Sequence, residues 1–247
     1  MKIVCIIPSR LDSKRLPRKA LLPIKGKPMV QRTYENAAAA PFISDVIVAT
    51  DSEEIADVIR QIGGKVSMTP ENISNGTLRV ACVARDMTDV QVVINLQGDE
   101  PFVTHSMLKE LVSPYLNGEL PEMTTLAHPL DIMQYQKPEA VKVITNLQQN
   151  AIYFSRSPIP FYRNQLSAPV YHHIGMYAFR HDFLMLYQTL PETTLEQVES
   201  LEQLRVLEHG YPIRVCITDQ KTLEINTPEE YQAAQDFNEN QDQILCK

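Results

Sequence analysis

Short, mainly apolar runs recur along the first half of the chain, separated by longer segments in which polar residues predominate. Ile3–Ile7, Val46–Ala49 and Val92–Leu96 are such runs, and each is rich in β-branched residues. Because a strand covered on both faces is apolar at nearly every position, these runs predict buried strands of a parallel sheet. Lys65–Met68 is a fourth, shorter candidate. We expect Pro8 to end the first strand, since proline has no N–H for the sheet ladder.

Segments with helical spacing lie between these runs. Met29–Ala40 is predicted to be a helix, and 53–62 carries apolar residues on one face, with Asp51 as the expected N-cap and Gly63 at its end. Further helices are expected near 78–85 and from Thr104. Strands that alternate with helices predict an α/β fold with a mostly parallel central sheet and helices on both faces. Right-handed crossovers would then place the loops that follow the strands at one end of the sheet.

Strand-like segments follow each other more closely in the second half. Met123–His128, Ala140–Thr145, Ile152–Ser155 and His173–Phe179 have short links between several of them. We interpret the chain as a single domain, 1–247, with a β-rich insertion at approximately 122–190 that covers the ligand cleft and supports a dimer. After the insertion we expect one amphipathic helix that starts near Leu195 and closes at Gly210, a strand at Ile213–Ile217, and a last helix capped by Thr227 with Pro228 and Glu230.

The composition favours a globular enzyme. The chain has 247 residues, a net charge of -7, 44% hydrophobic and 21% charged residues, which is ordinary for a domain with a substantial core. No apolar run approaches the roughly 20 residues that span a membrane, and the N-terminus enters a strand directly, without a leader pattern. The four cysteines are scattered, which indicates reduced thiols and a cytoplasmic protein. The acidic pI near 5.4 argues against general nucleic-acid binding.

Five cations lie in the loop after the first strand: Arg10, Lys14, Arg15, Arg18 and Lys19. Open α/β sheets bind ligands at the carboxyl ends of their strands, and a multiply charged phosphate is a suitable partner for such a cluster. The loop therefore indicates a nucleoside triphosphate site. The alternative is a solvated basic turn, in contact with nucleic acid or with nothing.

A carboxylate follows another buried strand, in Gln97-Gly-Asp99-Glu-Pro101. Asp99 is placed to hold Mg²⁺, which takes few protein oxygens and keeps sites for water and phosphate; Glu100 is a second candidate, and a simple turn with a helix cap is the alternative. Asn75-Gly76-Thr77 is a weak phosphate cradle or a plain turn. Neither the P-loop motif nor the dinucleotide-binding motif is present, which disfavours a P-loop hydrolase and a dinucleotide dehydrogenase.

Several short motifs follow one another in order along the chain. They are Asn95-Leu-Gln-Gly-Asp-Glu-Pro101, Tyr153-Phe-Ser-Arg156, His173-Ile-Gly-Met-Tyr177 and Leu201-Glu-Gln-Leu-Arg205, with Pro8-Ser-Arg10, Ser13-Lys-Arg15-Leu-Pro17, Lys19, Gly26-Lys-Pro-Met29, Ala49-Thr-Asp51, Asn75-Gly-Thr77, Arg79 and Thr227-Pro228. Single blocks such as Gly26-Lys-Pro-Met29 occur in many sugar nucleotidyltransferases, whereas the combination is specific. Together the motifs resemble one known family, the 3-deoxy-manno-octulosonate cytidylyltransferases, or CMP-Kdo synthetases, and the resemblance runs from about Ile3 to about Tyr231.

The resemblance implies a nucleotidyltransferase-like variant of the Rossmann fold and a Mg²⁺-dependent transferase. Its reaction would convert CTP and Kdo to CMP-Kdo and pyrophosphate, for lipopolysaccharide biosynthesis in the cytoplasm, in a homodimer. The implied catalytic residues are Lys19, Asp99 and Arg15, and the implied metal ligands are Asp99 and Asn226. CTP would contact Arg10, Ser13, Arg15, Lys19, Asn75 and Gly76, and the sugar would contact Gln97, Arg156, His173, Tyr177, Glu202 and Gln203.

Structural explanations stay open for several of these residues. His173 and Tyr177 are also consistent with a buried strand, and Glu202 and Gln203 with the solvated face of a helix. Two other functions stay open as well. One is a cytidylyltransferase for another sugar acid, an amino-Kdo or a nonulosonate; the other is a non-catalytic nucleotide-binding regulator.

Three positions depart from the family pattern. Arg18 stands where glycine is common and Leu78 where an acidic residue is common. Asn226 stands where an aspartate usually precedes Thr227-Pro228, and in the family that carboxylate is a second metal ligand. Asparagine keeps an oxygen donor but loses the charge, so the resemblance implies weaker metal binding or an altered acceptor.

We predict that Asn226→Asp lowers the Mg²⁺ concentration needed for half-maximal activity, because it restores a negative charge to the metal site. The measurement is the initial rate across a Mg²⁺ titration of both proteins. An unchanged Mg²⁺ dependence would count against a role for this position in metal binding.

Overall fold

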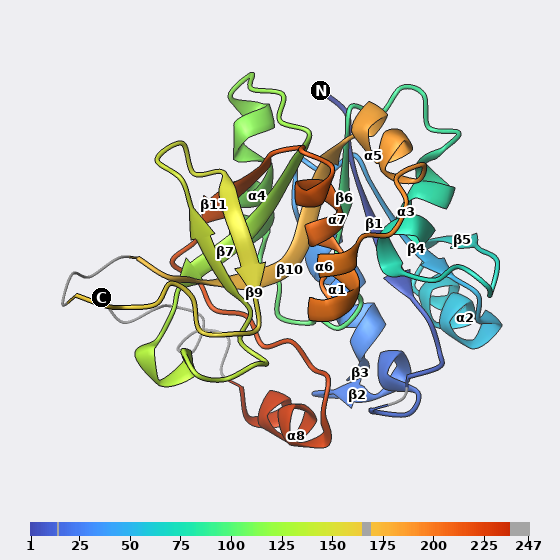
Figure 1. Cartoon of the computed structure of the whole chain (residues 1–247). Coiled ribbons are helices and arrows are strands. Elements are labelled where there is room, and N and C mark those ends of the chain that lie inside the picture. The colour runs from blue at the N-terminus through green and yellow to red at the C-terminus, as the bar shows by residue number, and fades with distance from the viewer. Residues whose placement is uncertain (14, 165–168, 238–247) are drawn as a thin grey trace. The chain divides into compact units, whose positions relative to one another are not determined.

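The computed structural model describes residues 1–13, 15–164 and 169–237 (Figure 1). The chain forms two compact units, one made of 1–109 and 220–247 and the other of 110–219. No helix in the described part of the chain combines the length and the apolar character needed to cross a membrane.

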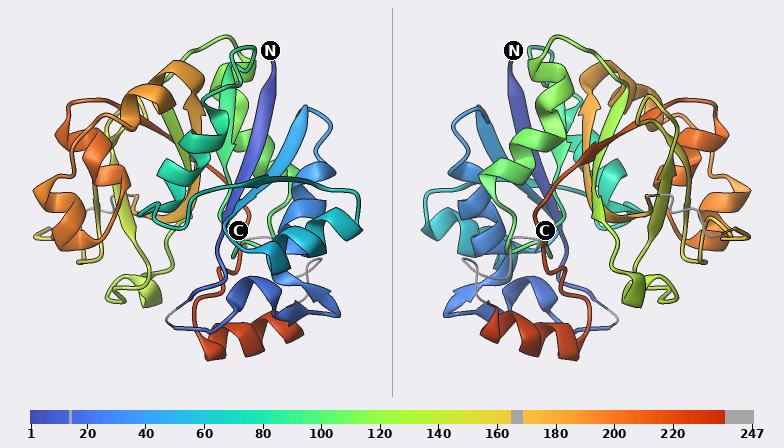
Figure 2. Two further views of the ribbon diagram at one scale, coloured as in Figure 1. Left: turned by 90° about the vertical axis from the view of Figure 1, so that its right-hand side faces the viewer. Right: turned by 90° about the vertical axis from the view of Figure 1, so that its left-hand side faces the viewer.

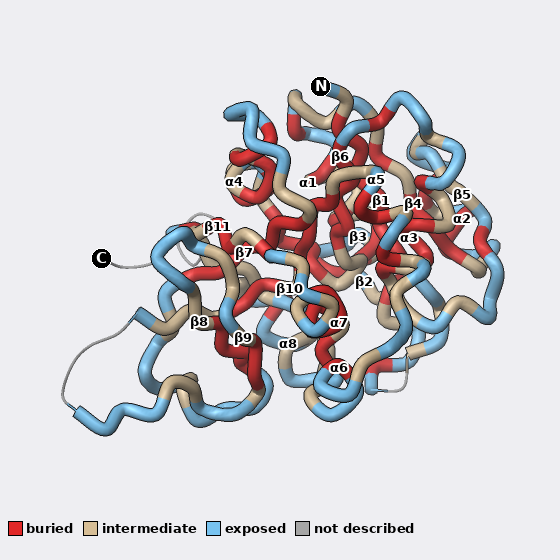
Figure 3. The backbone as a smooth tube through the Cα atoms, turned by 45° about the horizontal axis from the view of Figure 1, so that its top comes forward, coloured by how far each residue is buried: buried red, intermediate tan, exposed pale blue. Residues whose placement is uncertain are grey.

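The first unit contains a four-stranded parallel sheet in the order β6-β1-β4-β5. Its strands are β1 (Ile3–Ser9), β4 (Asp45–Thr50), β5 (Lys65–Met68) and β6 (Val92–Asn95). Every residue of β1 and of β6 is buried, and Figure 3 colours buried residues red along the backbone. This confirms that the runs at Ile3–Ile7 and Val92–Leu96 form strands covered on both faces. β5, at the edge of the sheet, is a strand as predicted but has no buried residue.

Helices lie on both faces of this sheet. α1 (Met29–Ala38) and α2 (Glu53–Gln61) pack on one face and α3 (Gly76–Ala84) on the other (Figure 2). Right-handed crossovers produce this arrangement because β5 connects back to β6 in the opposite direction along the sheet. α4 (His105–Leu116) starts in this unit and continues into the second.

A small apolar cluster supports the loops at the carboxyl end of the sheet. It joins Leu16 to Met29 and Phe102, and it also includes Ile24, Ile225 and Ala234. The cluster packs α8 (Pro228–Asp236) against the hairpin of β2 (Pro23–Ile24) and β3 (Lys27–Pro28). Leu16 and Leu22, on either side of the short helix η1 (Lys19–Leu21), also belong to it or pack against it. The backbone N–H of Ile225 donates to the carbonyl of Asp99 at 3.2 Å. The segment before α8 is thereby tied to the loop that leaves β6.

The second unit is built on a largely antiparallel arrangement. β7 (Met123–Pro129) pairs antiparallel with β10 (Tyr171–Arg180) and parallel with β11 (Ile213–Ile217). β8 (Lys142–Thr145) pairs with β10 and with β9 (Ala151–Ser155). The remaining elements are η2 (Ile132–Gln134), α5 (His181–Tyr187), α6 (Thr194–Glu199) and α7 (Gln203–Glu208).

Two local predictions about strand and helix ends were wrong, and so was a third, about a helix in the second unit. β1 continues through Pro8, which pairs with Ala49 of β4; the missing N–H is tolerated because β6 pairs with β1 only as far as Ile6. Ser52, not Asp51, caps α2 and accepts from the N–H of Ile55 at 3.4 Å.

The single helix expected between Leu195 and Gly210 is two helices. Ser200 has φ 52° and ends α6 in the left-handed conformation, and α7 begins three residues later. Val198 is 76% exposed, so the apolar residues of this segment do not share one buried face. In contrast, the capping box of Thr227 and Glu230 at the start of α8 is confirmed.

Two adjacent histidines lie on β10; His173 is buried and His172 is half-buried. The His172 ring lies against His128, with centroids 5.0 Å apart, and the His173 ring lies against Phe154 at 4.9 Å. Neighbouring side chains of a strand point to opposite faces, which explains the different partners. Burial, with a smaller contribution from His172, lowers the pKa of His173 to about 3.

This burial predicts an acid-sensitive fold. The unfolded chain binds a proton at position 173 below about pH 6.5, whereas the folded protein does not until about pH 3, so stability falls as the pH drops through this window. When the pH is lowered from 7 to 5, the buried His173 should therefore reduce the free energy of unfolding by about 2 kcal/mol. Urea unfolding of His173→Gln should show a pH dependence smaller by that amount. The exposed His105→Gln is the control, and equal slopes for His173→Gln and wild type would contradict the prediction.

Candidate active site

A pocket of about 540 Å³ lies at the carboxyl end of the parallel sheet in the first unit. The loop after β1, the start of α3, the loop after β6 and the segment before α8 line it. These segments come together because the strands run parallel and therefore release their following loops at one end. The lining includes Arg10, Ser13, Arg15, Lys19, Asn75, Gly76, Arg79, Gln97, Gly98, Asp99, Glu224 and Asn226.

Lys19 joins the two segments on which the metal prediction rests. Its Nζ donates to Asp99 Oδ2 at 2.5 Å and to Asn226 Oδ1 at 3.0 Å. Arg15 Nη2 donates to the same Asn226 oxygen at 2.9 Å. The Lys19 and Asp99 side chains are 18% and 17% exposed, so their charges interact in a medium less polarisable than water. Residues separated by about 80 to 210 positions in sequence thus share one polar cluster.

One carboxylate oxygen of Asp99 has no hydrogen-bond partner among the described residues. Oδ1 is buried and accepts no hydrogen bond from the residues that the structure describes. A buried carboxylate oxygen without a partner is rare in folded proteins, and a water molecule or a cation would satisfy it. No three or more His, Cys, Asp or Glu side chains gather into a metal-binding group among the described residues. A Mg²⁺ ion, which takes one or two carboxylates and fills its other positions with water and phosphate, still fits this donor set.

Glu100 does not line the pocket. It is buried and accepts from the Thr222 hydroxyl at 2.6 Å. Burial, reinforced by the negative charge of Glu224, raises the pKa of Glu100 well above its usual value. Its role is therefore that of a buried carboxyl that ties the β6 loop to the segment before α8.

Glu224 is a pocket residue that the sequence reasoning missed. Its Oε1 accepts from Asn226 Nδ2 at 2.6 Å. The residue is exposed; partial desolvation of its carboxylate, followed by the negative charge of Asp99, raises its pKa. The spacing of Glu224 and Asn226 could have identified it, because side chains two positions apart in extended backbone point to the same side.

The cationic loop divides into residues that face the pocket and residues that do not. Arg10, Arg15 and Lys19 line it. Arg18 instead forms an ion pair with Glu54 of α2, with Nη1 3.2 Å from Oε1, and its φ of 55° is the left-handed conformation that glycine adopts most easily. Lys14 lies outside the described residues.

The predicted nucleoside residues lie at the start of α3. Asn75 caps this helix by accepting from the N–H of Leu78 at 2.8 Å. A Cβ on Gly76 would lie 3.2 Å from the side-chain amide oxygen of Gln97 and 3.3 Å from the Pro8 ring. Gly76 therefore allows the helix start to approach the end of β1 and the loop after β6 closely. Gln97 is held in turn by Asn95, to which its Nε2 donates at 3.0 Å.

Arg79 and Asp51 form a buried ion pair beside these residues. Arg79 Nη2 lies 2.7 Å from Asp51 Oδ2, and the arginine also donates to the Thr69 hydroxyl. The Arg79 side chain is 3% exposed. Asp51, at the end of β4, thus serves as a counter-ion for α3 instead of a helix cap.

Five of the predicted sugar residues belong to the second unit. Three of them contact one another: the Tyr177 hydroxyl donates to Gln203 Oε1 at 3.0 Å, and the His173 and Tyr177 rings lie 5.6 Å apart. Gln203 Nε2 is buried without a partner among the described residues. Arg156 lies apart from this group and donates through Nε to the carbonyl of Glu199 at 2.9 Å. Glu202, half-buried, precedes α7.

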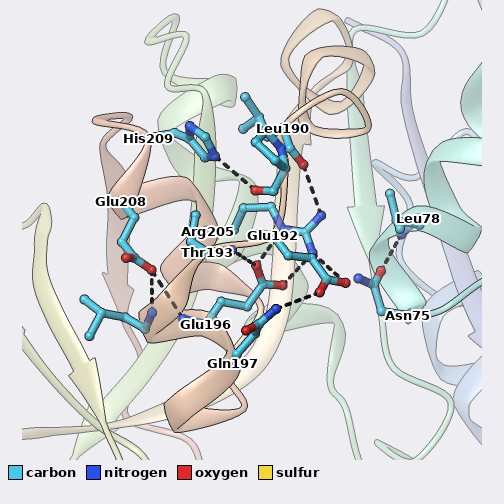
Figure 4. Close-up of polar contacts among 12 residues, drawn as sticks. Asn75, Leu78, Leu190, Glu192, Thr193, Glu196, Gln197, Arg205, Glu208 and His209 are labelled. Carbon is cyan, nitrogen blue, oxygen red and sulfur yellow. Dashed lines mark hydrogen bonds and ion pairs between the residues drawn. The ribbon is translucent and has the colours of Figure 1, made fainter.

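An arginine of the same motif has a structural role (Figure 4). Arg205 binds both oxygens of Glu196, with Nε–Oε2 and Nη2–Oε1 distances of 2.7 and 2.6 Å. Its guanidinium also lies 5.1 Å from the centre of the Tyr187 ring. This paired arrangement holds α7, and with it Gln203, against α6.

Comparisons with known proteins agree with this geometry. A family model described as cytidylyltransferase matches residues 4–236. The chain is 53% identical over 238 residues to a 3-deoxy-manno-octulosonate cytidylyltransferase of Acaryochloris marina, with 96% of this chain and 97% of the relative covered. An enzyme of the same name from Synechococcus elongatus is 47% identical over 236 residues, with 95% and 97% covered.

A solved structure supports the same assignment. It is that of CMP:2-keto-3-deoxy-manno-octonic acid synthetase complexed with CTP, and it is 39% identical with a TM-score of 0.88, covering 96% of this chain and 100% of the other. The α/β fold and the family predicted from the sequence are thereby confirmed. This chain belongs to the cytidylyltransferase family, among the 3-deoxy-manno-octulosonate cytidylyltransferases.

Proposed function

We propose that this chain transfers the cytidylyl group of CTP to Kdo, with release of pyrophosphate. The observation that carries the proposal is the convergence of Lys19, Arg15 and Asp99 in one pocket, at the sheet end where nucleotides bind in such folds. The names of the relatives supply the acceptor: the two compared above are 3-deoxy-manno-octulosonate cytidylyltransferases.

The residues of the chain fit the demands of the reaction. Displacement at phosphorus needs positioned reactants and stabilised negative charge more than covalent help from the protein. Arg10, Arg15 and Lys19 offer three positive charges to a triphosphate in a pocket that they line together. Lys19, already held by Asp99 and Asn226, is placed to neutralise charge on the departing pyrophosphate.

The remaining pocket residues bind and orient. Asn75 and Gly76 present the start of α3 to the nucleoside, and Gln97 is fixed by its bond to Asn95. Asp99 would hold a Mg²⁺ ion through its unpartnered Oδ1. That ion would neutralise phosphate charge and bring the acceptor hydroxyl toward the α-phosphate. Arg156, His173, Tyr177, Glu202 and Gln203 are the proposed sugar contacts.

We predict that pyrophosphate is released from CTP only with a sugar acid and Mg²⁺ present, and fastest with Kdo. Lys19→Gln should lower kcat by about 100-fold or more, because it removes a charge that acts on the transition state. The measurement is a coupled pyrophosphate assay over a panel of Kdo, an amino-Kdo and a nonulosonate.

Arg18→Gln is the matched control. It removes a cation from the same loop, but this cation pairs with Glu54 and does not line the pocket, so activity should stay within about twofold of wild type. Faster turnover with another acid would reassign the acceptor. No turnover with any acid, while CTP still binds, would favour a non-catalytic regulator.

The same proposal includes a cytoplasmic homodimer that supplies an activated sugar acid for cell-surface polysaccharide. The second unit exposes three large apolar side chains, Ile132, Met133 and Phe161, which are 73%, 75% and 88% exposed, and in a dimer such side chains could be covered. Size-exclusion chromatography with light scattering should therefore give twice the 28.1 kDa chain mass. A monomer mass at micromolar concentration would contradict the dimer.

A further inference from the structure

The amide of Asn226 has only one orientation that satisfies its neighbours. Its Oδ1 faces two cationic donors, Arg15 Nη2 and Lys19 Nζ, and its Nδ2 faces the carboxylate of Glu224. Exchanging oxygen and nitrogen would set NH₂ against two cations and oxygen against a carboxylate. The hydrogen-bond network therefore assigns the amide.

This orientation makes Asn226 a weak ligand for a metal ion. Its only acceptor atom is shared by two positive side chains at 2.9 and 3.0 Å, and a third positive charge at the same oxygen would meet repulsion from both. The carboxylate that usually stands at this position would bring a full negative charge to offset them, whereas an amide brings only a dipole.

Glu224 lies beside Asn226 and carries the negative charge that the Asn226 amide lacks. It lines the same pocket as Asp99, and the amide of Asn226 fixes its Oε1 at 2.6 Å. Its other oxygen, Oε2, has no hydrogen bond from any residue that the structure describes. Independently of Glu224, the buried Oδ1 of Asp99 accepts no hydrogen bond from the described residues, so it is free to bind a cation.

We propose that Glu224 supplies the second negative charge that this pocket offers to a divalent cation, and that Asn226 acts through its amide by holding Glu224 and the two cationic side chains in place. The inference rests on the proposed function of the pocket. It transfers the second acidic role from position 226 to position 224. Mg²⁺ prefers carboxylate oxygens, and groups that orient ligands or charge around a metal commonly change its affinity 10- to 100-fold when removed.

The test is a Mn²⁺ titration of the whole protein with CTP and without a sugar acid, in which free Mn²⁺ is followed by electron paramagnetic resonance. The signal is corrected with a titration of CTP alone. Glu224→Gln should weaken Mn²⁺ binding by about tenfold or more. The control is Glu229→Gln, which removes an exposed acid from the first turn of α8 and should bind as the wild type does.

A double variant separates charge from a local structural role. Asn226→Asp in the Glu224→Gln background places a carboxylate back beside Lys19, and it should recover most of the lost affinity. The gain from Asn226→Asp should be larger there than in the wild type, because the two positions supply the same charge. Thermal melting checks each variant, and if Glu224→Gln melts early, Glu224→Asp, which keeps the charge, should bind Mn²⁺ more tightly than Glu224→Asn.

Wild-type affinity in folded Glu224→Gln, or no rescue by Asn226→Asp, would overturn the inference. Its failure is distinct from failure of the proposed function. Turnover of CTP and Kdo by Glu224→Gln at the wild-type Mg²⁺ requirement would remove Glu224 from the metal site and leave the enzyme assignment intact. If Glu224→Gln weakened Mn²⁺ binding but the wild-type protein did not turn over CTP and Kdo, the metal role of Glu224 would stand and the proposed function would fail.

Discussion

The ion pair between Lys19 and Asp99 is the contact on which the rest of the pocket depends. It joins the loop after β1 to the loop after β6 across a distance of 2.5 Å, in a setting where both side chains are mostly buried. Since a partly buried charge without a partner costs free energy, each residue requires the other. Asn226 completes the arrangement by accepting from Lys19 and Arg15, so the segment before α8 is held to the same cations.

The backbone around this pair explains why the pocket can be so crowded with charge. Parallel strands deliver the two loops to one end of the sheet, and glycines let them approach. A Cβ on Gly98 would lie 3.2 Å from the Ser9 hydroxyl oxygen. Beneath the loops, the apolar cluster that includes Leu16, Phe102 and Ile225 fixes their bases. The polar cluster therefore rests on a packed apolar base.

In the second unit, one motif residue is fully paired within the protein and another has a polar atom without a partner. Arg205 is committed to both oxygens of Glu196 and to the face of Tyr187. Its neighbour Gln203 instead keeps one buried amide nitrogen without a partner among the described residues. A motif read as one functional block thus contains a side chain that holds α7 in place and another with hydrogen-bonding capacity left for a ligand.

The sequence by itself determined the parallel strands of the first unit, their order along the chain and the family. Buried parallel strands leave a strong signal because every position is apolar, and the capping box before α8 is a local pattern. It also placed Arg10, Arg15, Lys19 and Asp99 among the pocket residues. The break at Ser200 was not visible, because one residue in the left-handed conformation leaves the apolar spacing on either side unchanged.

Only the tertiary structure decided how the charges are paired. Arg18 turns to Glu54 while Lys19, its neighbour, turns to Asp99, and nothing in a run of basic residues distinguishes them. Glu100 is buried against Thr222, whereas Glu224 lines the pocket. The physical reason is that electrostatic attraction depends on distance in space. The loops that carry these side chains are far apart in sequence, and only the folded sheet brings them close together.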